Sequence, residues 1–145
     1  MDILSKKKIL FLCTGNSARS QMAEGLVSHF RGEEFESFSA GIDPKGVHPM
    51  ALKVMQEMDI DITNQHSKHL DEIKNIEFDY VITLCDHAEQ NCPLFFTKGK
   101  RIHKAFSDPA AVKGSDDDIS ASFRLVRDQL KEYILDFTDD EDDIA

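Results

Sequence analysis

The sequence has few cysteines, few basic residues and no long apolar run, and each shortage excludes a class of protein. Its 145 residues include three cysteines, an odd number that cannot close into a disulfide framework. No apolar run reaches the roughly 18 residues that a membrane-spanning helix needs, and no leader with a long apolar stretch precedes Lys6. We therefore expect a cytoplasmic protein that is neither secreted nor embedded in a membrane.

Basic residues are outnumbered by acidic ones, 17 to 27, which gives a net charge of −10. Such a chain is a poor general binder of nucleic acid, because that binding depends mainly on cations that neutralise phosphates. Five of the acidic residues form an uninterrupted block from Asp139 to Asp143. Because like charges repel one another, we expect residues 139–145 to be a disordered tail. Residues 1–138 have the length of a single domain.

Apolar segments alternate with amphipathic ones along the chain. Buried or alternating apolar residues predict strands over 8–12, 35–40, 80–84 and 101–106. Helical spacing predicts helices over about 22–30, 49–58 and 119–137, with a shorter one near 67–73. Strands that alternate with helices are typical of an α/β fold. We expect a three-layer, doubly wound domain with a four-stranded parallel sheet covered on both faces.

Two cysteines directly follow predicted strands. Cys13 comes after the first strand and Cys85 after the third. Doubly wound sheets bind ligands beyond the carboxyl ends of their strands, near the point where the strand order reverses. We therefore expect both thiols at one edge of the sheet, where they could meet.

The segment from Cys13 to Ser20 has the features of an oxyanion-binding loop. Backbone N–H groups at a helix start point toward one spot, where the helix dipole favours negative charge. Arg19 adds a planar set of donors that matches two oxygens of a tetrahedral oxyanion. These positive elements also favour the thiolate of Cys13, the nucleophilic form. The predicted oxyanion-binding residues are Thr14, Gly15, Asn16, Ser17, Ala18, Arg19 and Ser20.

Two other interpretations of this segment are weaker. A buried, inert cysteine is the simpler assignment for a single Cys at a strand end, because Cys is among the most buried residue types. The spacing of Cys13 and Arg19, with Gly15 between them, favours a functional loop. A mononucleotide-binding loop is excluded, since no Gly-Lys-Ser or Gly-Lys-Thr sequence ends the segment.

These residues resemble the low-molecular-weight tyrosine phosphatase superfamily, whose signature is Cys-x5-Arg-Ser after the first strand. Within it, the run Cys-Thr-Gly-Asn-Ser-Ala-Arg-Ser-Gln-Met-Ala-Glu is similar to the thioredoxin-coupled arsenate reductases. The phosphatases usually carry Pro where Gln21 stands. The resemblance extends from Lys8 to about Phe137 and implies a phosphatase-like fold.

The resemblance also implies a role for Asp108. Expelling oxygen from a tetrahedral oxyanion needs a proton donor, and Asp108-Pro109 matches the Asp-Pro acid of the family. Taken alone, Asp-Pro indicates only a turn. Phosphatases of the family tend to follow the Pro with an aromatic residue, whereas this chain has Ala110 and Ala111. A small inorganic oxyanion needs no aromatic wall.

Cys85 and Cys92 form a second pair of thiols, separated by six mainly polar residues that predict a mobile loop. By resemblance, Cys13 attacks arsenate and Cys85 then attacks the sulfur of the adduct, which releases arsenite. Cys92 in turn attacks Cys85, and reduced thioredoxin regenerates the resulting Cys85–Cys92 disulfide. The implied function is thioredoxin-dependent arsenate reduction in arsenic detoxification, with Cys13, Cys85, Cys92, Arg19 and Asp108 as catalytic residues.

Two alternatives remain. A phosphatase acting on phosphotyrosine or small phosphoesters needs Cys13 but neither of the other cysteines. A non-catalytic zinc or thiol-redox binding module could use His87 beside the cysteines, although the paired short spacing of structural zinc sites is missing. For the reductase, we expect arsenate (with phosphate or sulfate as analogues) and thioredoxin as partners. We also expect a monomer without a metal or a tightly bound cofactor.

Some relatives bind potassium near the loop through residues that correspond to Asn16, Glu24 and Ser39, together with a Thr and an Asp. Those last two positions hold His66 and Lys68 here. A fixed ammonium group disfavours a second cation in the same place. We therefore expect no potassium requirement.

Overall fold

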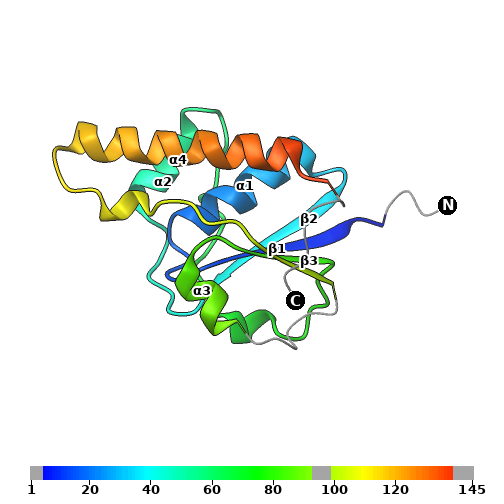
Figure 1. Cartoon of the computed structure of the whole chain (residues 1–145). Coiled ribbons are helices and arrows are strands. Elements are labelled where there is room, and N and C mark those ends of the chain that lie inside the picture. The colour runs from blue at the N-terminus through cyan, green and yellow to red at the C-terminus, as the bar shows by residue number, and fades with distance from the viewer. Residues whose placement is uncertain (1–4, 93–98, 139–145) are drawn as a thin grey trace.

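A parallel sheet with the strand order β2-β1-β3-β4 lies at the centre of the computed structural model, which describes residues 5–92 and 99–138 (Figure 1). Each neighbouring pair of strands is parallel, which confirms the predicted α/β fold with a four-stranded parallel sheet. The strand order reverses between β1 and β3, so this fold has its switch point where those two strands end. The strands are β1 (Lys7–Cys13), β2 (Phe35–Gly41), β3 (Tyr80–Thr83) and β4 (Lys100–His103).

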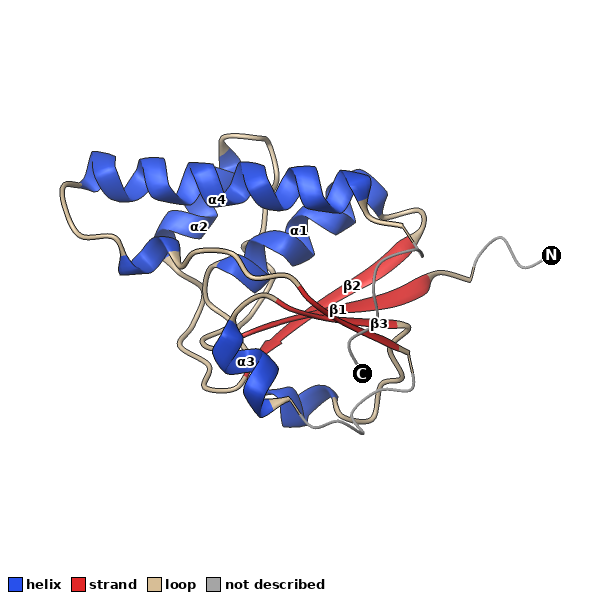
Figure 2. Cartoon of the chain, viewed as in Figure 1, coloured by secondary structure: helices blue, strands red, loops and turns tan. Residues whose placement is uncertain are grey.

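Helices cover both faces of the sheet (Figure 2). On one face lie α1 (Arg19–Arg31), α2 (Pro49–Gln56) and α4 (Asp116–Asp136). On the other face lie α3 (Asp86–Asn91) and the 3₁₀ helix η1 (Leu70–Ile73). A second 3₁₀ helix, η2 (Pro109–Ala111), leads into α4. Because both faces are covered, β1 is buried from Ile9 to Cys13 as a continuous apolar run.

Three predicted elements differ from the structure. The short helix expected near residues 67–73 is only the four-residue 3₁₀ helix η1. The fourth strand ends at His103, before the predicted boundary at residue 106. The segment between Cys85 and Cys92, predicted as a mobile loop, is helix α3. Its six residues are too few to show a helical stripe, and Ala88 is the one that packs fully into the core.

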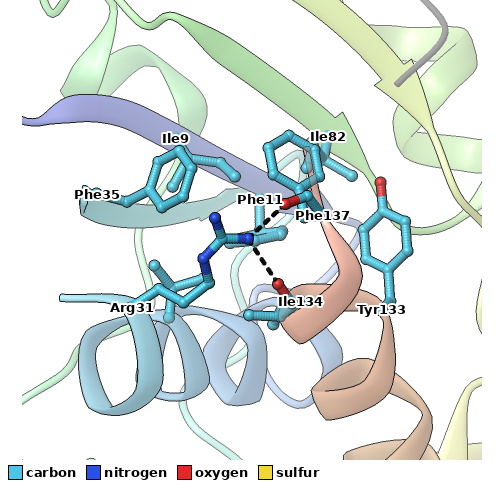
Figure 3. A pocket seen from close by; sticks show the side chains of 9 residues that line it. Ile9, Phe11, Arg31, Phe35, Ile82, Tyr133, Ile134 and Phe137 are labelled. Atoms are coloured by element: carbon cyan, nitrogen blue, oxygen red, sulfur yellow. Dashed lines mark hydrogen bonds between the residues drawn. The ribbon is translucent and has the colours of Figure 1, made fainter. Parts of the chain in front are cut away.

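The amino-terminal end of the sheet is closed by an aromatic cluster (Figure 3). Phe137 packs edge-to-face on Phe35 and Tyr80, with ring centroids 5.9 and 5.1 Å apart. Arg31 of α1 donates hydrogen bonds to the carbonyl oxygens of Ile134 and Phe137, at 3.0 and 2.5 Å. Arg31 thus ties the end of α1 to two carbonyls at the end of α4. The cluster fixes the carboxyl-terminal ends of α1 and α4 at the end of the sheet opposite to the thiols.

Among the described residues, no helix combines the length and the apolar character needed to cross a membrane. The acidic tail predicted for 139–145 lies outside the described residues. The single domain over residues 1–138 stays a prediction.

Candidate active site

The carboxyl ends of β1 and β3 bring two of the predicted thiols to one edge of the sheet. Cys13 is the last residue of β1, and Cys85 is the N-cap of α3, two residues after β3. The backbone N–H of Leu84 donates to the carbonyl of Leu12 at 2.8 Å, so the strands stay paired up to the thiols. The side chain of Thr14 lies 3.3 Å from Cys85 Sγ. Cys13, Cys85 and Cys92 are all buried and present as thiols.

A pocket opens at this edge above Cys13. Five of the residues that line it come from the predicted oxyanion loop, and Arg19 and Asp108 face each other across it. The lining consists of Cys13, Thr14, Gly15, Ser17, Ala18, Arg19, Lys45, Asp108 and Ala110. The structure therefore brings together the predicted nucleophile, cation and acid, while Cys92 lies at the far end of α3.

Asn16 and Ser20 belong to the predicted loop, but their side chains lie behind it. Asn16 is fully buried and has a φ of 46°, in the left-handed region that Asn tolerates better than most residues. Its Nδ2 donates to Ser20 Oγ at 2.8 Å, and Ser20 Oγ lies 3.0 Å from Cys13 Sγ. Because Ser20 accepts from Asn16, its own hydroxyl hydrogen can point to the sulfur. Ser20 is therefore placed to donate a hydrogen bond to the predicted nucleophile.

Gln21 supports the same loop, a role that the sequence did not reveal. Its Nε2 donates to the carbonyl and to the side-chain oxygen of Asn16, at 3.1 and 3.0 Å. Gln65 donates in turn to the backbone and side-chain oxygens of Gln21, both at 2.9 Å. Gly41, at the end of β2, leaves room for the loop, since an added Cβ would lie 2.8 Å from the Thr14 carbonyl. The loop is thus held by Gln21, which Gln65 holds in turn, and is accommodated by the missing side chain of Gly41.

Arg19 and Asp108 are each held by backbone groups. Arg19 is 9% exposed and donates through Nη1 to the carbonyl of Phe106 at 3.0 Å. Its Nη2 lies 3.9 Å from Asp108 Oδ2, while Asp108 Oδ1 accepts from the backbone of Ala110 at 3.0 Å. One carboxylate oxygen is therefore fixed and the other faces the guanidinium. Ala110 lines the pocket at the position where phosphatases tend to have an aromatic residue, so no aromatic ring from this position covers that side of the pocket.

Lys45 lines the pocket and was missed at the sequence level. It follows β2, whose carboxyl end reaches the same edge of the sheet, and this position is the signal that could have identified it. Its backbone N–H donates to the Gly15 carbonyl at 2.8 Å, and its ammonium group pairs with Asp43 at 2.8 Å. The hydrogen bond from Lys45 lowers the pKa of the Asp43 carboxyl. Lys45 adds a positive charge at the mouth of the pocket.

A polar network holds α3 against β3 and β4. Thr83 Oγ1 donates to Glu89 Oε2 at 2.9 Å, and His103 Nε2 lies 2.8 Å from Asp86 Oδ1. Arg101, which is 2% exposed, donates to the Cys92 carbonyl at 3.4 Å. Burial raises the pKa of the Cys92 thiol, and the Arg101 charge opposes that shift. Cys92 is therefore held as a protonated thiol while α3 is folded.

The helical form of α3 keeps Cys85 and Cys92 apart. They cap its two ends, and at 1.5 Å per residue seven steps along a helix span about 10 Å. A disulfide needs Cα atoms no more than about 7 Å apart. The two thiols can join only if α3 unwinds at least in part, which breaks contacts of the polar network.

The Lys68 ammonium group lies beside Ser39, one of the residues that correspond to potassium ligands in some relatives. Lys68 Nζ donates to the carbonyls of Ser39 and His66, both at 3.0 Å. Ser39 Oγ donates to Glu24 Oε1 at 2.6 Å. Burial raises the pKa of Glu24, while the Ser39 hydrogen bond and the Lys68 charge oppose this shift. Within residues 5–92 and 99–138, no three His, Cys, Asp or Glu side chains are grouped to hold a metal ion.

Comparison with known proteins agrees with this geometry. The family model described as low molecular weight phosphotyrosine protein phosphatase matches residues 8–141. An arsenate reductase from Halalkalibacterium halodurans is 45% identical over 136 residues, covering 94% of this chain and 98% of the relative. One from Oceanobacillus iheyensis is 47% identical over 131 residues, covering 90% of this chain and 94% of the relative.

Solved structures give the same result. An arsenate reductase in its oxidized state has a TM-score of 0.74 at 32% identity, covering 88% of this chain and 93% of that one. A thioredoxin-dependent arsenate reductase from Corynebacterium glutamicum has a TM-score of 0.62 at 28% identity, covering 90% of this chain and 62% of that one. The chain therefore belongs to the low molecular weight phosphotyrosine protein phosphatase family, in which many of its relatives are named arsenate reductases.

Proposed function

We propose that this protein reduces arsenate to arsenite, with Cys13 as the nucleophile and Cys85 and Cys92 as a disulfide relay that thioredoxin regenerates. The observation that carries the proposal is the contact of Thr14 Oγ1 with Cys85 Sγ at 3.3 Å, directly beside the nucleophile. This contact puts a second thiol against Thr14, a residue that lines the pocket above Cys13. A phosphatase has no use for that thiol, whereas a reductase requires it.

The first step forms a bond between Cys13 and arsenic. The loop N–H groups and Arg19 hold the arsenate oxygens, and the Cys13 thiolate attacks arsenic. Asp108 gives a proton to the departing hydroxide, which leaves as water. Its fixed position 3.9 Å from Arg19 supports this role, because both groups line the same pocket.

The second step transfers two electrons to arsenic. The Cys85 thiolate attacks the Cys13 sulfur, so that a sulfur–sulfur bond forms and the sulfur–arsenic bond breaks. The electron pair of the broken bond stays on arsenic, which leaves as arsenite. Cys92 then attacks Cys85 and releases Cys13 as a thiolate. The Cys85–Cys92 disulfide is reduced by the dithiol of thioredoxin through thiol–disulfide exchange.

The related arsenate reductases support this assignment over a phosphatase, and so does the pocket itself. Ala110 lines it where an aromatic side chain would flank a phenyl ring. Phosphatase activity toward small phosphoesters can coexist with reduction, because both reactions begin with attack by the same thiolate. Phosphate and sulfate should compete with arsenate for the pocket.

We propose that no tightly bound cofactor takes part and that potassium is not required. Lys68 supplies a positive charge to the carbonyls of Ser39 and His66, which supports the second point. We further propose that the protein acts as a monomer in the cytoplasm, where reduced thioredoxin is available, and that it serves arsenic detoxification.

The proposal is tested by NADPH oxidation in the presence of arsenate, thioredoxin and thioredoxin reductase, measured beside the hydrolysis of an aryl phosphate. Cys85→Ser and Cys92→Ser should each abolish reductive turnover but leave hydrolysis, whereas Cys13→Ser should abolish both. If arsenate drives no NADPH oxidation while both relay variants hydrolyse aryl phosphate rapidly, the protein is a phosphatase. Stoichiometric zinc in the purified protein would instead support the binding-module alternative.

A further inference from the structure

Thr14 connects the oxyanion loop to α3 through two contacts of one hydroxyl group. Thr14 Oγ1 lies 3.3 Å from Cys85 Sγ and 3.1 Å from His87 Nδ1. Cys85 is the N-cap of α3, and His87 lies in its first turn, where its side chain is exposed to solvent. The sulfur, the hydroxyl and the imidazole nitrogen therefore form a continuous hydrogen-bonded chain from the buried thiol to the surface.

Such a chain can carry a proton. A hydroxyl group donates one hydrogen bond and accepts others, so Thr14 can accept from the Cys85 thiol while it donates to the neutral nitrogen of His87. After transfer, Thr14 donates to the thiolate and accepts from the imidazolium. The same two contacts fit both protonation states, and no side chain has to move.

We propose that His87 accepts the proton of Cys85 through Thr14 and so prepares Cys85 for its attack on the Cys13 adduct. The inference rests on the proposed function, because only a reductase needs Cys85 as a nucleophile. A neutral imidazole nitrogen accepts a proton, and His87 Nδ1 is the nitrogen that Thr14 Oγ1 contacts. His87 reaches the sulfur only through Thr14 and is therefore a positioning residue for this step.

The protons and electrons of the step balance. The Cys85 S–H bond breaks, its proton goes to Thr14 Oγ1, and the hydroxyl proton of Thr14 goes to His87 Nδ1. The thiolate then bonds to the Cys13 sulfur, and the pair from the sulfur–arsenic bond reduces arsenic as described above. The imidazolium of His87, being exposed, returns its proton to water.

The charges around His87 suit an imidazolium. The Asp43 carboxylate, on the loop after β2, interacts with His87 and more weakly with His69, the N-cap of η1. The carboxylates of α3 itself are held elsewhere, since Asp86 pairs with His103 and Glu89 accepts from Thr83. His87 is thus the basic group that contacts the Cys85–Thr14 pair within the described residues.

The test follows the second step alone. In a Cys92→Ser background the reaction stops at the Cys13–Cys85 disulfide, whose formation after mixing with arsenate is followed by acid quench, alkylation and mass spectrometry. The variant His87→Gln keeps a hydrogen-bonding group but cannot take a proton. It should slow disulfide formation at least about tenfold at neutral pH, within the range of general-base effects. His29→Gln, an exposed histidine on α1, is the matched control and should change neither step.

A pH series from about 6 to about 9 spans the ordinary pKa values of imidazole and thiol. The deficit of His87→Gln should shrink toward the alkaline end, where hydroxide from the solvent competes with His87 as the acceptor of the Cys85 proton. In a Thr14→Val background, His87→Gln should add no further loss, because the chain is already broken. This dependence on Thr14 separates a relay from a general weakening of α3.

The inference is wrong if His87→Gln forms the disulfide at the wild-type rate at neutral pH. It is also wrong if the variant slows aryl phosphate hydrolysis by the same factor, which would indicate a distorted loop. A deficit that is constant across the pH series, or that persists in Thr14→Val, would contradict the relay as well. If the parent protein forms no disulfide with arsenate at all, the proposed function itself fails.

Discussion

Asn16 is the residue on which the shape of the oxyanion loop depends most. It is fully buried, and its φ of 46° lies in the left-handed region. Its Nδ2 donates to Ser20 at 2.8 Å, and its Oδ1 accepts from the backbone of Lys68 at 2.9 Å and from Gln21 at 3.0 Å. We therefore expect Asn16→Ala to destabilise the protein and to disorder the contact between Ser20 and Cys13.

Three contributions add up to the expected loss of stability in Asn16→Ala. Alanine in the left-handed region costs about 1 kcal/mol or more. The part-buried N–H of Lys68 loses its acceptor, which costs about 1–3 kcal/mol, and the lost bond to Ser20 adds about 1 kcal/mol. Gln21 retains acceptors in the carbonyls of Asn16 and His66, so it adds little. The free energy of unfolding should fall by about 3–5 kcal/mol, or Tm by about 10 °C for a domain of this size.

Urea denaturation of the wild type, Asn16→Ala and Asn16→Gly measures this loss. Glycine removes the backbone strain but gains chain entropy when unfolded, so Asn16→Gly should retain only about 0.5–1 kcal/mol more stability than the alanine variant. Asn64→Ala, at an exposed position, should change stability by no more than about 0.5 kcal/mol. An Asn16→Ala variant within about 1 kcal/mol of the wild type would refute the reasoning, since the loop would then hold its shape without the side chain.

Three further predictions concern other parts of the structure. Gly41→Ala should lower both arsenate reduction and aryl phosphate hydrolysis, because its Cβ would lie 2.8 Å from a loop carbonyl, and unchanged rates for both would contradict this. The hydrogen bonds of Arg124 lower the pKa of Glu57 from 4.5 to about 2, so this pair stabilises the fold above pH 4.5 and loses its effect as pH falls toward 2. Glu57→Gln should therefore lower the free energy of unfolding, measured by urea denaturation, by about 1 kcal/mol or less at neutral pH and not at all near pH 2. An equal loss at both pH values would contradict this prediction. Replacing sodium by potassium should leave the reduction rate unchanged, because the Lys68 ammonium group already binds the carbonyls of Ser39 and His66. A several-fold rise would show that a cation still binds.

The strands at the centre of the fold could be predicted because a strand that is buried on both faces needs a continuous run of apolar residues in the sequence. Residues 8–12 and 80–84 each carry such a run, and they lie in β1 and at β3. Helix α4 could be predicted for a related reason, since its 21 residues show the helical spacing several times over. Helix α3 is too short for any period to appear, and contacts of Glu89 with β3 and of Asp86 with β4 hold it in place.

The site was predictable where chemistry and chain position coincide. Cys13, Arg19 and Asp108 meet at one pocket because each follows a strand or begins a helix at the same edge of the sheet. Lys45, which follows β2 at the same edge, could have been identified in the same way. Gln21 could not, because its role depends on the backbone carbonyl and the side-chain oxygen of Asn16, and such contacts leave no pattern in the sequence.

The central claim is that three thiols act in one relay, and a disulfide map tests it most directly. Fully reduced protein is treated with one equivalent of arsenate without thioredoxin, quenched with an alkylating agent, digested and analysed by mass spectrometry. The account predicts one arsenite released per chain, a disulfide between Cys85 and Cys92, and Cys13 recovered as the alkylated thiol. If all three cysteines are alkylated and the arsenate is unchanged, the relay does not exist.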